Sequence, residues 1–175
     1  SFSNVVQNGI TYHEWITNDA GYTFHNWYGF GAIDADAAIT AATGYTAGSL
    51  GSQSYKTWTL SSALNASIPE GSSYSDAINI GTSGTIEFVR VAIKFSHANS
   101  YELGFRLESP AGTVSTLLQP KTALNDNPAG TYIYLSANAF YGESMAGNWK
   151  LHMYDHDSNS VQATLSDWAI DFYYR

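Results

Sequence analysis

Ser144 lies in the segment Tyr141–Gly147, the part of the chain that most resembles the surroundings of a catalytic nucleophile. A serine acts as a nucleophile when a histidine accepts its proton and a carboxylate holds that histidine in place. Here the preceding residue is Glu143, whose negative charge would lie beside the nucleophile. Gly147 disfavours a helix after the serine, and strand-like alternation resumes at Trp149. We therefore expect no catalytic residue in this chain.

Histidines are the second group that could do chemistry, because neutral imidazole binds zinc. The five are His13, His25, His97, His152 and His156. Only His152 and His156 have the i, i+4 spacing of two ligands on one helix face, and the pattern places them on a strand and its following turn. Surface or core histidines are therefore the favoured interpretation, and a zinc site is the alternative.

An oxygen-rich turn follows the strand that ends near residue 154. Asp155 precedes the run His156–Ser160, which offers several hard oxygen ligands in a short loop, and such a composition suits calcium. The run lacks the twelve-residue pattern with a terminal glutamate, and Asp and Asn are also ordinary turn residues. Asp155 and Asp157 are accordingly calcium candidates, and calcium is the one cofactor suggested. The run Asn125–Asn127 is a second, weaker oxygen-rich turn.

Composition narrows the classes of partner. The 15 acidic residues outnumber the 7 lysines and arginines, which gives a net charge of −8 across 175 residues. Such a charge repels phosphate backbones and anionic lipids, so we expect neither nucleic-acid nor membrane binding. The absence of cysteine excludes disulfides and thiolate chemistry. With 44% hydrophobic and only 13% charged residues, the chain is expected to be folded, and its length suits one domain or one domain plus a fragment.

The elements that must position these residues fall into two compositional types. Residues 10–30 are crowded with aromatic residues and histidine. Residues 32–43 are rich in alanine, with Asp34 and Asp36 near the start and Gly44 at the end, a pattern typical of a capped helix. Glycine and serine follow as a linker. The sequence therefore predicts one helix near the N-terminus.

From about residue 55 the hydrophobic period changes to two, which is the period of a β-strand. The clearest alternating segments are residues 89–95, 103–107, 149–153 and 168–174. Turn residues separate the strands, as in Ser109–Gly112. Many short strands without a further predicted helix indicate an antiparallel sandwich or barrel.

Two stretches resemble neighbouring parts of one protease family. Residues 25–39, His-Asn-Trp-Tyr-Gly-Phe-Gly-Ala-Ile-Asp-Ala-Asp-Ala-Ala-Ile, resemble the C-terminal end of the catalytic domain of kexin/furin-like subtilases. Residues 107–118, Leu-Glu-Ser-Pro-Ala-Gly-Thr-Val-Ser-Thr-Leu-Leu, resemble the hallmark of the proprotein convertase P domain. Residues 142–151 and 165–170 are similar to the Gly-x-Trp-x-Leu and terminal strands of that domain, so Ser144 falls inside a P-domain motif.

The resemblance implies a domain organisation and a fold. Residues 1–43 would be the C-terminal tail and last helix of a subtilisin-like protease domain, residues 44–52 a linker and residues 53–175 the P domain. The implied fold is all-β, an antiparallel jelly-roll β-sandwich of about eight strands, preceded by an N-terminal segment with one α-helix.

The resemblance also implies a function. It implies a non-catalytic P domain of a secreted, extracellular kexin-like serine endopeptidase that supports the folding, stability and regulation of the protease domain. The absence of cysteine suggests a bacterial member of the family. The partner would be the catalytic domain of the same polypeptide, and protein substrates would be reached through it. The subtilisin-type motifs Asp-Ser-Gly, Asp-Thr-Gly and His-Gly-Thr do not occur, so the triad is expected to lie outside this chain.

One alternative and one structural expectation accompany this interpretation. The alternative is a stand-alone carbohydrate- or protein-binding jelly-roll module, whose sugar-stacking faces would come from Tyr132, Tyr134, Tyr154, Tyr173 and Tyr174. The expectation concerns Trp15, Trp27, Tyr28 and Phe30, which would be exposed if their own domain were missing. We expect the segment that carries them, residues 10–43, to fold onto the sandwich or onto a neighbouring chain.

Overall fold

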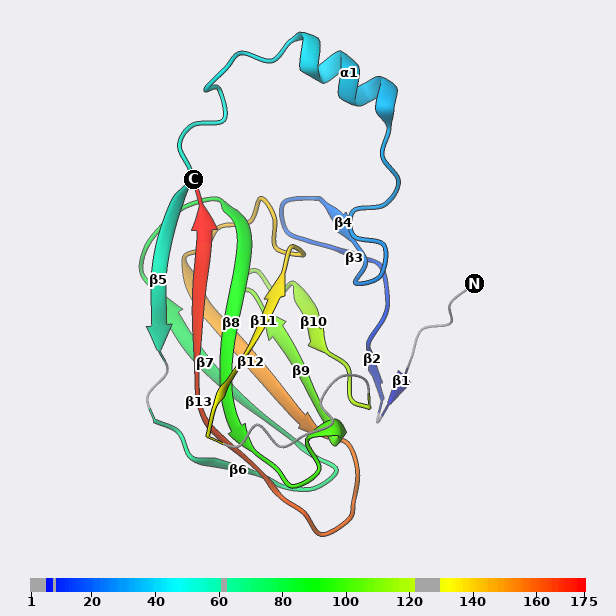
Figure 1. The fold of residues 1–175 in the computed structure, drawn as a ribbon, viewed down its shortest axis with the longest axis vertical. Helices are drawn as coiled ribbons and strands as arrows, with labels where there is room; N and C mark the ends of the chain where they lie inside the picture. Colours follow the sequence, from blue (N-terminus) through cyan, green and yellow to red (C-terminus); the bar gives the residue numbers. More distant parts are fainter. Residues whose placement is uncertain (1–5, 8, 61–62, 122–129) are drawn as a thin grey trace.

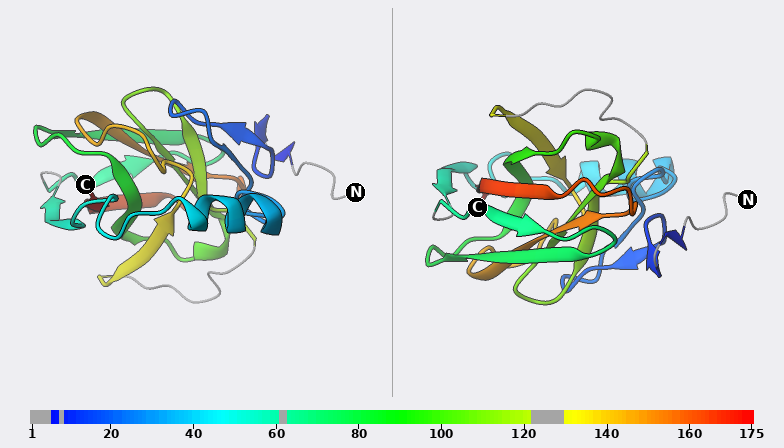
Figure 2. Two further views of the ribbon diagram at one scale, coloured as in Figure 1. Left: turned by 90° about the horizontal axis from the view of Figure 1, so that it is seen from above. Right: turned by 90° about the horizontal axis from the view of Figure 1, so that it is seen from below.

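Two antiparallel β-sheets packed face to face form the body of the protein (Figures 1 and 2). The structure is a computed structural model that describes residues 6–7, 9–60, 63–121 and 130–175. One sheet contains, in spatial order, β10 (Val114–Leu118), β9 (Leu103–Glu108), β12 (Gly147–Asp155) and β7 (Ser73–Ile80). The other contains β11 (Tyr132–Ala137), β8 (Ile86–Ser96), β13 (Ala163–Tyr174) and β5 (Ser54–Leu60), with β6 (Ala66–Ile68) paired to β13.

The alternating residues of the two sheets meet in a single apolar core. On the five-stranded sheet, Ile93 of β8 pairs with Trp168 of β13, and both are fully buried. On the four-stranded sheet, Phe105 of β9 pairs with Met153 of β12, and both are fully buried as well. Because side chains alternate between the two faces of a strand, the apolar set of each strand faces the other sheet. The core thus follows directly from the period of two.

The expected antiparallel β-sandwich is confirmed. The alternating segments 89–95, 103–107, 149–153 and 168–174 lie inside β8, β9, β12 and β13, respectively. The two sheets have four and five strands, one more in total than the eight expected from the sequence. A single turn of 3₁₀-helix, η1 (Ser100–Glu102), joins β8 to β9.

The N-terminal part runs along one side of the sandwich and then leaves it (Figure 1). It forms two short hairpins, β1 (Val6–Gln7) with β2 (Ile10–Thr11) and β3 (Ile16–Thr17) with β4 (Thr23–Phe24).

The helix predicted for residues 32–43 is present as α1 (Ala35–Thr43). It begins at residue 35 because the side chain of Asp34 accepts a hydrogen bond from the N–H of Ala37 and so caps the first turn. No residue of α1 is buried, and the helix stands away from both sheets (Figure 1). Within the described part of the chain, no helix is long and apolar enough to cross a membrane.

Candidate functional site

Residues 9–31, here called the N-terminal arm, are attached to the sandwich by buried polar contacts. Asn18 is the central one, because its side-chain amide donates to the carbonyl oxygens of Ala139 at 2.9 Å and Tyr141 at 2.8 Å. Its Oδ1 accepts the N–H of Tyr22 at 2.8 Å, which shapes the β3–β4 turn. Asn18 is buried, so these bonds are shielded from water. One side chain therefore fixes both the turn and its position.

On the sandwich, Glu143 and Gly142 contact the same β3–β4 turn. The buried Glu143 carboxylate accepts the backbone N–H of Asp19 at 3.0 Å and the hydroxyl of Thr113 at 2.5 Å. Gly142 has a positive φ of 83°, and a Cβ there would come within 2.9 Å of Ala20. Glycine is thus required both by the backbone conformation and by the close approach of the arm.

A second attachment lies at the other end of the arm. Tyr12 is buried and hydrogen-bonded to Nε2 of His156, and its neighbour His13 is hydrogen-bonded to Gln119. Burial raises the pKa of Tyr12 and lowers the pKa of His156 to about 4. The neutral imidazole therefore accepts a hydrogen bond from the Tyr12 hydroxyl, which keeps its proton. A Cβ on Gly104 would come within 3.0 Å of both side chains, so the glycine makes room for this pair.

The outward side of the arm is aromatic and exposed. The side chains of Trp15, Trp27, Tyr28 and Phe30 are between 48% and 61% exposed. Trp15 and Tyr28 stack with their ring centroids 6.1 Å apart, so the group forms a surface rather than scattered side chains. The expectation that residues 10–43 fold onto the sandwich is confirmed for the arm and is wrong for α1, no residue of which is buried. The four aromatic residues are exposed, as expected. We call them the aromatic face.

A pocket of about 590 Å³ opens between the arm and the sandwich. Phe24 and Trp27 of the arm line one side, and Thr116 of β10 and Ser136 of β11 line the other. The lining combines aromatic and hydroxyl groups, and it shares Trp27 with the aromatic face.

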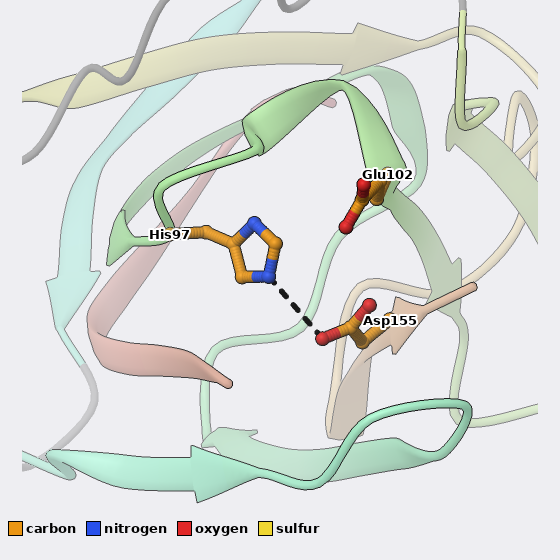
Figure 3. Close-up of side chains that lie close together, drawn as sticks. All are labelled: His97, Glu102 and Asp155. Atoms are coloured by element: carbon orange, nitrogen blue, oxygen red, sulfur yellow. Dashed lines mark ion pairs between the residues drawn. The ribbon is translucent and has the colours of Figure 1, made fainter. Parts of the chain in front are cut away.

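A cluster of ionisable side chains is buried at the end of the sandwich where β8 and β12 terminate (Figure 3). It consists of His97, Glu102 and Asp155, each at most 2% exposed, and their ligand-type atoms all lie within 4.8 Å of one another. Nε2 of His97 is 3.3 Å from Oδ2 of Asp155. Burial is the main cause that raises the pKa of the Asp155 carboxyl.

The hydrogen bonds around the cluster are distributed unevenly. Nδ1 of His97 accepts the N–H of Asn99 at 3.0 Å, and Nε2 lies 3.0 Å from the carbonyl oxygen of Val161. Both carboxylate oxygens of Glu102 accept from the side-chain amide of Asn159, at 2.7 and 2.9 Å. The two oxygens of Asp155 have no hydrogen-bond partner among the described residues.

Comparison with known proteins decides the family. The family model described as "Proprotein convertase P-domain" matches residues 86–172. These residues form a P domain. The match covers β8 to β13 and therefore most of both sheets.

Similar proteins are several times longer than this chain. The Aeromonas extracellular serine protease of Aeromonas sobria is 30% identical over 165 residues, which cover 86% of this chain and 26% of that protein. Human proprotein convertase subtilisin/kexin type 5 is 29% identical over 172 residues, which cover 92% of this chain and 9% of that protein. The chain thus spans about a quarter or less of the relatives it matches.

The crystal structure of the serine protease of Aeromonas sobria is similar in fold. It superposes with a TM-score of 0.83 at 24% identity and covers 95% of this chain, which is 34% of that chain. At this identity the likeness shows the fold alone. Because the match covers 95% of the chain, it includes most of the arm as well as the P domain.

The motif residues of the P domain have structural roles here. Ser109 and Gly112 close the tight turn between β9 and β10 through hydrogen bonds that link Ser109 to Thr113 and Gly112 to Ser109. Trp149 is fully buried, and its indole N–H donates to the carbonyl oxygen of Met145 at 2.9 Å. The serine and the glycine therefore form the turn, and the tryptophan packs in the core.

Ser144 is exposed, and its Oγ accepts the backbone N–H of Ala146 at 3.4 Å. Each of the five histidines is hydrogen-bonded to a residue other than Ser144 within the described ranges. Glu143, the residue before Ser144, binds the arm through the backbone N–H of Asp19.

The two calcium candidates are separated by the structure. Asp155 lies in the buried cluster, whereas the Asp157 carboxylate forms an ion pair with Lys121 at 2.9 Å near the surface. The weaker candidate run Asn125–Asn127 lies outside the described residues. His152 bonds to Glu108 rather than sharing a site with a second histidine.

Sequence reasoning did not include His97 and Glu102 in this cluster. Both flank the short connection between β8 and β9, more than 50 positions before Asp155. The alternating pattern placed Glu102 at the start of a strand, whereas the structure places it in η1. The sequence offered no indication that this turn faces the end of β12.

The tyrosines of the carbohydrate-binding alternative do not gather on one face. Tyr132 and Tyr134 are exposed on β11 at the edge of one sheet, whereas Tyr154 belongs to β12 in the other sheet. Tyr173 and Tyr174 are neighbours on β13, so their side chains point to opposite sides of that strand. A single stacking platform is not formed.

Proposed function

We propose that this chain is the P domain, with the adjoining end of the catalytic domain, of a secreted bacterial subtilisin-like serine endopeptidase of the kexin type. In this proposal the chain is non-catalytic and stabilises the folded protease domain. Residues 1–43 belong to the catalytic domain, residues 44–52 form the linker and residues 53–175 form the P domain. The extracellular location is supported by the name of the Aeromonas sobria relative.

The observation that carries this proposal is the position of the aromatic face. The arm that bears it is bound to the sandwich by Asn18 and Tyr12, yet its outward side is left exposed. Exposed clusters of large aromatic side chains are typical of protein interfaces. The arm can therefore bind the P domain on one side and the rest of the protease on the other.

Mass action gives the physical reason for stabilisation. A surface that binds only the folded protease domain shifts the unfolding equilibrium of that domain towards the folded state. A short covalent tether raises the effective concentration of the two surfaces to about the millimolar range. The net charge of −8 would in addition favour basic protein substrates or a basic docking surface.

The test uses the full-length protease that contains this chain. The double variant Trp15→Ala, Phe30→Ala is expected to lower the temperature of half-inactivation by several degrees, because it removes two of the four rings of the aromatic face. Tyr134→Ala is the matched control, since Tyr134 is 63% exposed on β11 and lies outside the aromatic face. Equal inactivation temperatures for the double variant, the control and the wild type would rule out docking through this face.

A separate labelling experiment tests the non-catalytic role. The isolated chain is incubated with a fluorophosphonate probe, with the full-length protease as the positive control. We expect the full-length protein to be labelled and the chain to remain unlabelled. Labelling of the chain that disappears in Ser144→Ala would make Ser144 a nucleophile and contradict the proposal.

A further inference from the structure

The buried cluster brings together two carboxyl groups that no described lysine or arginine accompanies. Glu102 and Asp155 are each about 1% exposed, and two carboxylates in such a place are costly unless a cation accompanies them. Within the described ranges, no lysine or arginine forms an ion pair with either carboxylate. Lys121, which is in the same region, pairs with Asp157 instead.

His97 does not supply the missing positive charge. Its Nδ1 accepts the backbone N–H of Asn99, so this nitrogen holds a lone pair and the ring proton lies on Nε2. The ring is then neutral, and its single N–H is directed at the carbonyl oxygen of Val161, with Oδ2 of Asp155 at 3.3 Å. A doubly protonated ring would lose the bond to Asn99.

The same hydrogen bond argues against His97 as a metal ligand. A histidine that binds a metal through one nitrogen donates its other ring N–H to an acceptor. Here the other nitrogen accepts from a donor, which is the opposite arrangement. The site therefore offers oxygen ligands, with His97 holding Asp155 in position, and hard oxygen ligands select calcium over zinc.

We propose that Glu102 and Asp155 bind a calcium ion at this end of the sandwich, with His97 as a positioning residue. The two oxygens of Asp155, buried and without hydrogen-bond partners, point into the cluster (Figure 3). One ligand-type atom from each of the three side chains lies within 4.8 Å of the other two, and one ion with calcium–oxygen distances of about 2.3–2.6 Å can bridge such a gap.

The ion would join segments that are far apart in the sequence. Glu102 comes from η1, Asp155 ends β12, and Asn159, which holds Glu102, lies in the connection to β13. Asp155 also precedes His156, the residue that binds Tyr12 of the arm. Calcium would thus fix this end of the sandwich and, through the next residue, the attachment of the arm. This inference does not depend on the proposed function.

Thermal unfolding of the full 175-residue chain tests the proposal. After treatment with a chelator, calcium at about 100 times its Kd is expected to raise the midpoint by about 5–10 °C. Magnesium and zinc are the comparison ions and are expected to give smaller shifts. A larger shift with zinc than with calcium would overturn the choice of metal, and the absence of any shift with calcium would overturn the site.

Two substitutions locate the ion. Asp155→Asn removes one charge at nearly constant volume, and we expect it to abolish the calcium-induced shift while leaving the chelator-treated protein at least as stable as the wild type. Asp157→Asn is the matched control two residues away, and it is expected to retain the shift. Loss of the shift in Asp157→Asn but not in Asp155→Asn would place calcium in the exposed turn and contradict the proposal.

Terbium luminescence supplies a readout that does not depend on unfolding. Terbium replaces calcium in oxygen sites and is excited through nearby aromatic rings, and Tyr101 is the neighbour of Glu102 in η1. We expect luminescence that calcium displaces in the wild type and in Asp157→Asn, and none in Asp155→Asn. Equal luminescence in all three proteins would show that terbium binds elsewhere and would exclude this cluster.

Discussion

Tyr12 donates a hydrogen bond to Nε2 of His156, a residue 144 positions later in the chain. Their rings meet edge to face, with centroids 5.4 Å apart, and both side chains are buried. This contact attaches the start of the arm to the end of β12. Because it joins the arm to the sandwich, a change in this contact is expected to alter the stability of both.

Tyr12→Phe removes only the hydroxyl group from this pair. The change leaves a buried imidazole nitrogen without its donor, which is expected to lower the free energy of unfolding by about 1–2 kcal/mol. Urea denaturation followed by tryptophan fluorescence measures the change. Tyr45→Phe is the control, because Tyr45 is 54% exposed, and it should leave the stability nearly unchanged. A loss of similar size in both variants would show that the buried bond contributes nothing.

His156 gives the protein a defined dependence on pH. Burial lowers its pKa from 6.5 to about 4, and the charges of Asp157 and Lys121 act on it in opposite directions. Because the folded-state pKa is below the unfolded value, the stability from the neutral ring is fully present above about pH 6.5. That stability is lost as the pH falls towards about 4.

The comparison of wild type with His156→Gln isolates this effect from other titrating groups. Between about pH 7 and pH 4.5 we expect the wild type to lose about 2–3 kcal/mol more unfolding free energy than the variant. Urea denaturation at both pH values measures the difference. If the two proteins lost stability in parallel, the imidazole would not be the group responsible.

Asn18→Ala tests whether the arm depends on its central anchor. The substitution removes two donated bonds and one accepted bond from a buried position, and it is expected to cost about 2–3 kcal/mol locally. Hydrogen exchange of residues 9–31 should then accelerate, while exchange in β8 and β13 stays slow. Asn26→Ala is the control, since Asn26 is exposed and donates a single bond to the carbonyl oxygen of Thr116. Equal protection of the arm in all three proteins would contradict the anchor role of Asn18.

The strands and the helix could be read from the sequence because their signals are local. Alternation at residues 89–95 and 168–174 depends only on the two faces of a strand, and it predicted β8 and β13 correctly. The alanine-rich run and Asp34 likewise predicted α1, since capping acts within one helical turn. The family motifs could also be recognised in the sequence, because the residues that form a turn such as Ser109–Gly112 are consecutive in the chain.

The sites depended on contacts that no local pattern encodes. Asp155 stood out as a candidate ligand through its composition, but its neighbours Glu102 and His97 are set by how β8, η1 and β12 end at the same edge of the sandwich. Periodicity predicts which side of a strand is apolar, but it does not predict which loop lies opposite the end of that strand. The sequence by itself therefore determined the two-sheet core and the family. Only the tertiary structure decided that Asn18 and Tyr12 hold the arm and that two carboxylates share a buried site, because these contacts join residues separated by 53 to 144 positions.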